Sequence, residues 1–154
     1  LNMVKNKETH TVLLRLNQFI PQLIQEDLAD IRNKIQLNIQ TDCCIYFDEA
    51  QLRQVLINLI RNAIRHNDID MPHIEVNIYP HEQKMWLDVR DFGQGVAIQH
   101  QASLFQPFFS TEITGTGLGL YLAHSFCEAN QAQLTYVEQQ RGACFRLSCQ
   151  RAVL

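Results

Sequence analysis

Apolar residues recur every three or four positions in one long segment of the chain, and this spacing predicts an amphipathic helix. The recurring residues are Leu52, Val55, Leu56, Leu59, Ile60 and Ala63. The segment opens with Asp48-Glu-Ala-Gln51, a pattern typical of a capped helix start because the first side chain can accept hydrogen bonds from backbone amides. We therefore expect a helix over about residues 49–67, with the recurring apolar residues in the core.

Two further helices and several strands follow from the same kind of pattern. Helices are expected over Asn17–Ile31, with Pro21 tolerated in a first turn, and over Leu118–Ala129. Alternating or short apolar segments predict strands at Thr11–Leu16, Ile35–Ile39, Ile45–Phe47, 73–79, 84–91, 132–138 and 142–149. Residues 92–116 hold three of the six glycines and show no sustained period, so a long loop is expected there.

The order of these elements predicts the fold class. The late strands are joined by short turns, such as Pro80-His-Glu-Gln83, and are therefore expected to be antiparallel. Helices and strands in this order predict one α+β domain, with a single mixed and mostly antiparallel sheet and three main helices on one face.

Composition excludes some classes of protein. The chain has 154 residues, 46% of them hydrophobic and 19% charged, which is typical of one globular domain. No apolar run approaches the ~18–20 residues that span a membrane, so no membrane contact is expected. The net charge of −3 argues against a nucleic-acid partner. The five cysteines show no C-x-x-C spacing and are expected to be reduced thiols in strands and helices.

The predicted long helix also carries a polar stripe. Asn58, Asn62, Arg65 and His66 lie at i, i+4, i+7 and i+8, so they share one side of the helix. A solvated surface would explain such a stripe. Asparagine is nevertheless a poor helix former, and a carboxamide oxygen can fill one position of a magnesium shell completed by waters and phosphate oxygens.

Asp91 is the second candidate for a ligand-binding residue. It keeps the parity of the apolar residues of its strand, so its carboxylate is expected to point inward and to need a donor. The exocyclic amine of adenine would supply one, whereas guanine presents an acceptor at that place. The glycines of Phe92-Gly-Gln-Gly95 would let the backbone approach a ligand closely. An ordinary turn aspartate is the alternative. Asp91-Phe92-Gly93 also spells the magnesium motif of eukaryotic-type protein kinases, but the other motifs of those kinases do not precede it.

Glycines at 115, 117 and 119 lead into the last predicted helix. Backbone amides at a helix start form a natural phosphate site. A tight entry into the helix is the alternative, since the spacing fits neither a dinucleotide-binding fingerprint nor a P-loop.

Together these segments resemble the catalytic ATP-binding domain of bacterial sensor histidine kinases, of the superfamily that includes gyrase, Hsp90 and MutL. The resemblance covers about residues 10–150. Its four boxes are Asn58-Leu-Ile-Arg-Asn62-Ala-Ile-Arg65-His66, Asp91-Phe-Gly93-Gln-Gly95, Leu104-Phe105-Gln-Pro-Phe108-Phe109-Ser-Thr111 and Gly115-Thr116-Gly117-Leu118-Gly119-Leu120. The segment 96–114, which would be a short lid in this family, and the sequence Cys-Glu-Ala-Asn-Gln-Ala132 look most like the nitrogen-regulation and type IV pilus branch.

The resemblance implies a fold and a set of site residues. The fold would be a two-layer α/β sandwich of the Bergerat type. Asp91 would bind adenine N6, Asn62 would ligate Mg²⁺, and residues 96–114 would be a lid over ATP, anchored by Phe105 and Phe108. The remaining ATP-binding residues implied are Asn58, Arg65, His66, Gly93, Gly95, Thr116, Gly117, Leu118 and Gly119.

The resemblance also implies a reaction and partners. Hydrolytic members carry a general-base Glu four residues before the magnesium Asn, where this chain has Asn58, which cannot act as a base. ATP would therefore donate its γ-phosphate to a histidine on a separate N-terminal dimerisation domain, and then to a response-regulator receiver. Residues 1–9 would be the linker to that domain and 10–154 the catalytic domain. The chain would be the cytoplasmic domain of a membrane-anchored sensor kinase.

One departure concerns charge. No Lys or Arg lies between Arg90 and Arg141, and Glu112 stands where related lids often carry a Lys. We therefore expect weak ATP affinity in isolation, or a lid cation supplied by the missing domain, and tighter binding in Glu112→Lys. A non-catalytic nucleotide-sensing module and an interaction domain with a dead pocket are the alternative functions.

Overall fold

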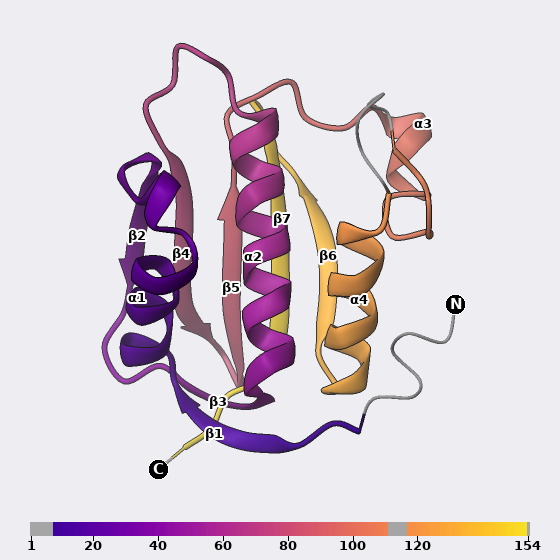
Figure 1. Ribbon diagram of the computed structural model, residues 1–154. Coiled ribbons are helices and arrows are strands. Elements are labelled where there is room, and N and C mark those ends of the chain that lie inside the picture. The colour runs from indigo at the N-terminus through magenta and orange to yellow at the C-terminus, as the bar shows by residue number, and fades with distance from the viewer. Residues whose placement is uncertain (1–7, 111–116, 154) are drawn as a thin grey trace.

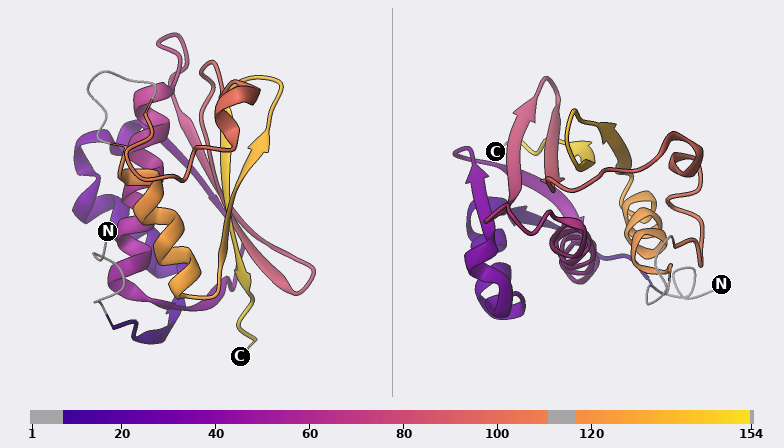
Figure 2. Two further views of the ribbon diagram at one scale, coloured as in Figure 1. Left: turned by 90° about the vertical axis from the view of Figure 1, so that its right-hand side faces the viewer. Right: turned by 90° about the horizontal axis from the view of Figure 1, so that it is seen from above.

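The computed structural model describes residues 8–110 and 117–153. It has two layers, a twisted sheet and a layer of helices that covers one face of it (Figures 1 and 2). In the view of Figure 1, helix α2 crosses the middle of the sheet, with α1 beside it on one side and α4 on the other. This arrangement confirms the predicted two-layer α+β sandwich.

The main sheet has five strands in the order β2-β4-β5-β7-β6. Strands β2 and β4 are parallel and the other pairs are antiparallel, as predicted for the hairpin-linked strands. These strands are β2 (Ile35–Ile39), β4 (Ile74–His81), β5 (Lys84–Arg90), β6 (Gln133–Glu138) and β7 (Ala143–Gln150).

The prediction of a single sheet was wrong. Strands β1 (Thr11–Arg15) and β3 (Cys44–Asp48) form a separate antiparallel pair. One isolated bridge, between Ile45 and Arg151, joins β3 to the segment after β7. Alternation of apolar and polar residues identifies strands, but it does not say which strand each will pair with.

Three main helices lie on one face, as predicted. They are α1 (Leu16–Asp27), α2 (Glu49–His66) and α4 (Gly119–Ala129). Helix α2 begins as expected, because Asp48 Oδ1 accepts a hydrogen bond from the Gln51 amide at 3.0 Å. Its apolar stripe, from Leu52 to Ala63, is buried.

Two helical segments differ from the prediction. Helix α1 ends at Asp27, and a 3₁₀ helix, η1 (Ala29–Lys34), follows where the helix was expected to continue. Pro21 is the sixth residue of α1, so it lies in the second turn rather than the first. The predicted loop at 92–116 contains one helical turn, α3 (Ile98–Gln101), which is too short to show a period in the sequence.

The core lies between the sheet and the helices. All five cysteines are buried free thiols, in or beside β3, α4 and β7. Burial raises the pKa of Cys144 and of Cys149 to about 12, so both thiols stay protonated at neutral pH. Within residues 8–110 and 117–153, no helix has both the length and the apolar character needed to cross a bilayer.

Candidate functional site

A cavity of about 700 Å³ opens at one end of the helix layer, where the last turns of α2 meet the end of β5 and the start of α4. It brings together most of the residues singled out in the sequence. Those that line it are Asn58, Asn62, Arg65, His66, Asp91, Gly93, Gly95, Gly117 and Gly119. Leu118, Phe105 and Phe108 do not line it, and Thr116 lies outside the described residues.

The polar stripe of α2 forms one wall of the cavity. Asn62 is half-buried, while Arg65 and His66 are exposed in the last turn of the helix. Asn58 bridges two helices, because its Nδ2 donates to the Gly119 carbonyl of α4 at 3.1 Å while its Oδ1 accepts from Gln54 at 2.7 Å. The stripe is therefore part of a site rather than only a solvated helix surface.

Asp91 is buried in the cavity floor, with 2% of its surface exposed. Its Oδ1 accepts hydrogen bonds from the Gly93 amide at 2.9 Å and the Ala143 amide at 3.2 Å. Burial raises the pKa of this carboxyl above its usual value, although the two backbone amides and the nearby His66 and Arg90 act to lower it. The inward orientation predicted from strand parity is confirmed.

The turn after Asp91 packs tightly against the end of α2. A Cβ at Gly93 would lie 1.9 Å from the His66 carbonyl oxygen, so no other residue fits at this position without movement of the backbone. The close approach that the glycines allow is thus first an approach to the helix. It fixes the distance between the Asp91 carboxylate and the α2 wall of the cavity.

The start of α4 forms the opposite wall. Gly119 is the first residue of this helix and is exposed to the cavity, and a Cβ there would meet nothing within 4 Å. Leucine at the N-cap position, Leu118, has no side-chain acceptor for the first amides of the helix. The open space at Gly119 leaves room beside this helix start for an anion, the kind of group that helix starts commonly bind.

The three phenylalanines between Leu104 and Ser110 have different environments. Phe105 stacks on His124 of α4, with ring centroids 4.8 Å apart, and meets Phe145 of β7 edge-on. Phe108 is 64% exposed, with a positive φ of 65°. Phe109, which belongs to the same motif but was not among the expected ATP-binding residues, lines the cavity and contacts the His100 ring. Phe105 is therefore packed against α4 and β7, whereas Phe108 is mostly exposed, and the lid that both were expected to anchor stays a prediction.

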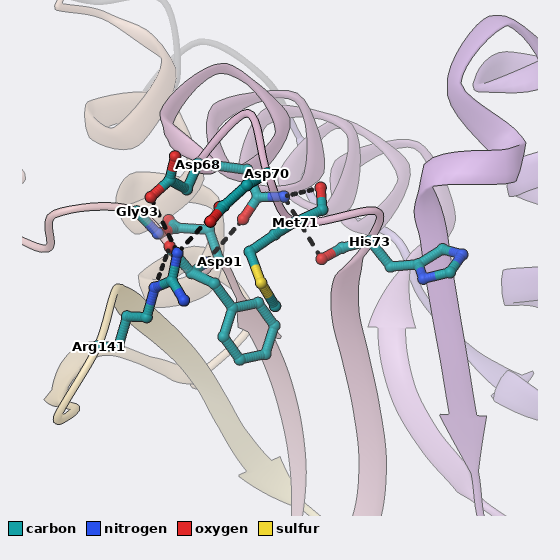
Figure 3. Close-up of polar contacts among 9 residues, drawn as sticks. Asp68, Asp70, Met71, His73, Asp91, Gly93 and Arg141 are labelled. Atoms are coloured by element: carbon teal, nitrogen blue, oxygen red, sulfur yellow. Dashed lines mark hydrogen bonds and ion pairs between the residues drawn. The ribbon is translucent and has the colours of Figure 1, made fainter.

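Two residues that shape the site were missed in the sequence. Asn67 caps the end of α2, and its Oδ1 accepts from the Phe92 amide at 2.8 Å. Arg141, in the turn between β6 and β7, donates to the Phe92 carbonyl at 3.0 Å (Figure 3). Both act across long sequence separations, so no local motif could have identified them. The cation gap in the sequence ends at Arg141, but a gap alone does not show where its end will lie.

The side chains that line the cavity suit a Mg²⁺ ion that is coordinated mainly by waters and the phosphates of a bound nucleotide, with few protein ligands. Among the residues that the structure describes, no group of three His, Cys, Asp or Glu could hold a metal ion by itself. Asn62 offers a carboxamide oxygen in the cavity. Mg²⁺ commonly binds proteins through one or two side chains and takes its remaining ligands from waters and phosphates.

Comparison with known proteins identifies a family that matches most of the chain. The family described as "Histidine kinase-, DNA gyrase B-, and HSP90-like ATPase" matches residues 47–152. The sensor protein kinase PilS of Pseudomonas aeruginosa is 34% identical over 158 residues, covering 96% of this chain and 29% of PilS. The chain thus spans under a third of that relative's length.

Solved structures share the fold. The catalytic domain of histidine kinase ThkA superposes with a TM-score of 0.79 at 24% identity, covering 92% of this chain and 96% of that chain. Full-length ShkA in complex with AMPPNP superposes with a TM-score of 0.77 at 21% identity, covering 96% of this chain and 32% of that chain. These likenesses confirm the predicted fold.

Proposed function

The chain belongs to the family of histidine kinase-, DNA gyrase B- and HSP90-like ATPases, and from this membership and the cavity we propose that it binds ATP with Mg²⁺ and donates the γ-phosphate to a histidine. The single observation that carries the proposal is the convergence of three separate segments on one cavity. The α2 stripe, the buried Asp91 and the open start of α4 lie far apart in the sequence, yet they line the same space.

In this proposal Asp91 recognises the base. A buried carboxylate oxygen accepts a hydrogen bond from the exocyclic amine of adenine, whereas guanine would present an acceptor to an acceptor. The two backbone amides on Oδ1 hold the carboxylate in place before the base arrives. A group held in this way loses little freedom on binding, which favours affinity.

The phosphate end is assigned to α2 and α4. Amides of the α4 start would hold phosphate oxygens, with Gly117 and Gly119 leaving space for them. Asn62 would hold Mg²⁺, which when bound neutralises charge on the phosphates. Arg65 and His66 add polar groups at the same wall. Thr116, the remaining phosphate candidate, lies outside the described residues and stays a prediction.

The proposed reaction is phosphoryl transfer rather than rapid hydrolysis. An imidazole nitrogen of the acceptor histidine would attack the γ-phosphorus, the bond from phosphorus to the β,γ-bridging oxygen would break, and ADP would leave. Activation of water would need a general base beside Asn62. The position for such a base, four residues before Asn62, holds Asn58. Its carboxamide is hydrogen-bonded to Gln54 and Gly119 and cannot take up a proton at neutral pH.

The partners and cellular context are proposed from the family. The acceptor histidine would lie on a dimerisation domain linked to this chain, with residues 1–9 as the linker, and the phosphate would pass to a response-regulator receiver. The chain would be the cytoplasmic part of a membrane-anchored sensor kinase. The expected effects of Glu112, including tighter ATP binding in Glu112→Lys, stay predictions, because residues 111–116 lie outside the described part of the chain.

Phosphotransfer can be tested by mixing this chain with separately produced dimerisation domains of sensor kinases that bear an acceptor histidine. Radiolabel from γ-labelled ATP should appear on such a domain as phosphohistidine, a phosphoramidate that is labile in acid and stable in base. Asn62→Ala should abolish labelling, and acceptor domains with the histidine replaced should stay unlabelled. ATP binding without labelling of any acceptor domain would favour a nucleotide-sensing module over a kinase.

A further inference from the structure

Resting on the proposed function, we infer that Arg141 is a positioning residue for nucleobase recognition. It ties the backbone after Asp91 to two aspartates of the α2–β4 loop. The base-recognising carboxylate would then depend on a residue 49 positions beyond the Phe92 carbonyl that it holds.

The guanidinium of Arg141 joins three segments of the chain. Its Nε donates to the Phe92 carbonyl at 3.0 Å, and its Nη2 lies 2.9 Å from Asp68 Oδ2 and 3.1 Å from Asp70 Oδ1. Figure 3 shows the guanidinium of Arg141 pointing toward Asp68, Asp70 and the turn that contains Asp91 and Gly93. We call this set of contacts the Arg141 clamp.

The clamp completes the support of one peptide segment. Phe92 follows the base-recognising Asp91, and both of its backbone polar groups are held by side chains. Asn67 accepts from its amide at 2.8 Å and Arg141 donates to its carbonyl at 3.0 Å. Asn67 lies at the end of α2, so the turn is held against the helix on one side and against the β6–β7 turn on the other.

The residues that follow Arg141 press on the same turn. A Cβ at Gly142 would lie 2.0 Å from the Asp91 carbonyl oxygen, so these two backbones are in close contact. The Ala143 amide donates to the Asp91 carboxylate, and its carbonyl accepts from the Asp91 amide at 2.9 Å. A shift of the β6–β7 turn would therefore move the Asp91 carboxylate as well as the Phe92 peptide.

The clamp also affects charge at the cavity. Asp68 lines the cavity, and Arg141 is the cation that contacts both Asp68 and Asp70. Without Arg141 these two carboxylates would oppose the entry of a triphosphate. Position and charge are separable effects, because replacing the aspartates by asparagine removes the repulsion without restoring a donor to the Phe92 carbonyl.

Removal of the clamp should leave the fold intact. The Arg141 side chain is 46% exposed, and its partners Asp68 and Asp70 are 47% and 70% exposed. Exposed ion pairs of this kind contribute little to the stability of a fold. A change in nucleotide binding in a variant at this position would therefore report on the turn rather than on global unfolding.

The test compares Arg141→Gln with the wild-type chain by calorimetric titration of Mg-ATP and Mg-GTP. We expect ATP binding to weaken about 5–20-fold, which is the order of effect expected from the loss of one hydrogen bond to a charged group. GTP, which makes no favourable contact with Asp91, should change much less, so the ratio of ATP to GTP affinity should fall. Arg141→Lys should recover only part of the ratio, since a lysine cannot donate in several fixed directions at once.

Two control variants separate the positioning of the turn by Arg141 from a general effect of removing an arginine and from neutralisation of Asp68 and Asp70. Arg61→Gln removes a 46% exposed arginine that contacts Asp30 and the Asp27 carbonyl outside the cavity, and it should leave both affinities unchanged. In Arg141→Gln/Asp68→Asn/Asp70→Asn, ATP binding should stay weak. Amide hydrogen exchange in the nucleotide-free chain should quicken at Gly93 in Arg141→Gln and not in Arg61→Gln.

The outcomes are distinct. A wild-type chain that binds no nucleotide would overturn the proposed function and this inference with it. A wild-type chain that binds ATP while Arg141→Gln keeps the same ratio of ATP to GTP affinity would overturn this inference alone. Recovery of ATP binding in the triple variant would also overturn it, because the role of Arg141 would then be charge neutralisation.

Discussion

Asp91 shows how far one residue could be read from the sequence. Strand parity predicted an inward carboxylate, and the structure confirms one that is 2% exposed. Of its two hydrogen bonds, the one from Gly93 is local and the one from Ala143 spans 52 positions. The local bond follows from the turn, whereas the distant one depends on strand pairing that no single segment specifies.

The substitution Asp91→Asn should separate binding from stability. Loss of a charged hydrogen-bond acceptor commonly costs about 1.5–3 kcal/mol, so ATP affinity should fall roughly 10–150-fold. The nucleotide-free variant should be no less stable than the wild type at neutral pH, because it removes a buried charge while an amide oxygen can still accept from Gly93 and Ala143. Calorimetry and thermal unfolding measure the two effects.

The difference in unfolding free energy between the wild type and Asp91→Asn should depend on pH. Burial raises the Asp91 pKa in the folded state, so the native carboxyl binds its proton before the unfolded one does as pH falls. The wild type should therefore gain stability relative to Asp91→Asn as pH is lowered from neutral toward 3.8, the unperturbed value. A difference in unfolding free energy between the two proteins that stays constant with pH would contradict the raised pKa of Asp91.

Two glycines of the site, Gly93 and Gly119, should differ sharply in how well they tolerate substitution by alanine. Gly93→Ala would place a Cβ 1.9 Å from the His66 carbonyl oxygen, whereas Gly119→Ala would place one in open space. We expect Gly93→Ala to cost about 2 kcal/mol or more in unfolding free energy, through backbone strain. Gly119→Ala should change it by less than about 1 kcal/mol and yet weaken ATP binding. Urea unfolding and calorimetry give both values, and equal destabilisation by the two would contradict this account.

At the scale of elements, most helices and strands were predictable and their junctions were not. The period of α2 and the capping by Asp48 are local properties, so its bounds were close to the prediction. The early end of α1, the η1 segment and the separate β1–β3 pair depend on tertiary packing. Helix α3 has only four residues and leaves no periodic signal.

The contact between α2 and α4 should matter for binding. Asn58→Ala would remove the hydrogen bond from Nδ2 to the Gly119 carbonyl, which fixes the start of α4 relative to Asn62. We expect a stability loss of about 0.5–1.5 kcal/mol and several-fold weaker Mg-ATP binding. Gln54→Ala, which removes only the partner of Asn58 Oδ1, is the matched control. Equal effects of the two variants would mean that the contact with Gly119 has no special role.

At the scale of the whole molecule, the site and the far face of the sheet should be independent. Asp88 and Arg146 form an ion pair there, with distances of 2.8 Å and 3.0 Å. Their side chains are 8% and 21% exposed, Tyr79 donates to Asp88 at 2.9 Å, and Arg146 lies over the Trp86 ring. These residues alternate in β4, β5 and β7 with those that face the helices and the cavity.

The substitution Arg146→Met should therefore destabilise the fold without changing nucleotide affinity. Leaving Asp88 buried without its partner should cost about 3 kcal/mol, within the range for broken buried ion pairs. Replacing both partners, in Arg146→Met/Asp88→Leu, should recover much of the loss. Chemical unfolding measures the stability, and titration of Mg-ATP on the folded variant should give the wild-type affinity. A large loss of affinity would show that the two faces are coupled.

The two-layer architecture and most of the residues that line the cavity could be predicted because four separate motifs agreed on one family. The helix layer, the mixed sheet and the cavity followed from that agreement, and the structure confirms the two layers. The support of the site could not be predicted in the same way. Asn67 and Arg141 act on Phe92 across 25 and 49 positions, and only the folded chain brings them together.

A magnesium-dependent titration of this chain with ATP, ADP and GTP tests the central claim most directly. We expect ATP and ADP to bind, ATP to tighten when Mg²⁺ is added, and GTP to bind at least about tenfold more weakly, because guanine offers the Asp91 carboxylate no donor. Equal binding of ATP and GTP would contradict the role of Asp91. Binding of none of the three would contradict the assignment of the cavity as an ATP site.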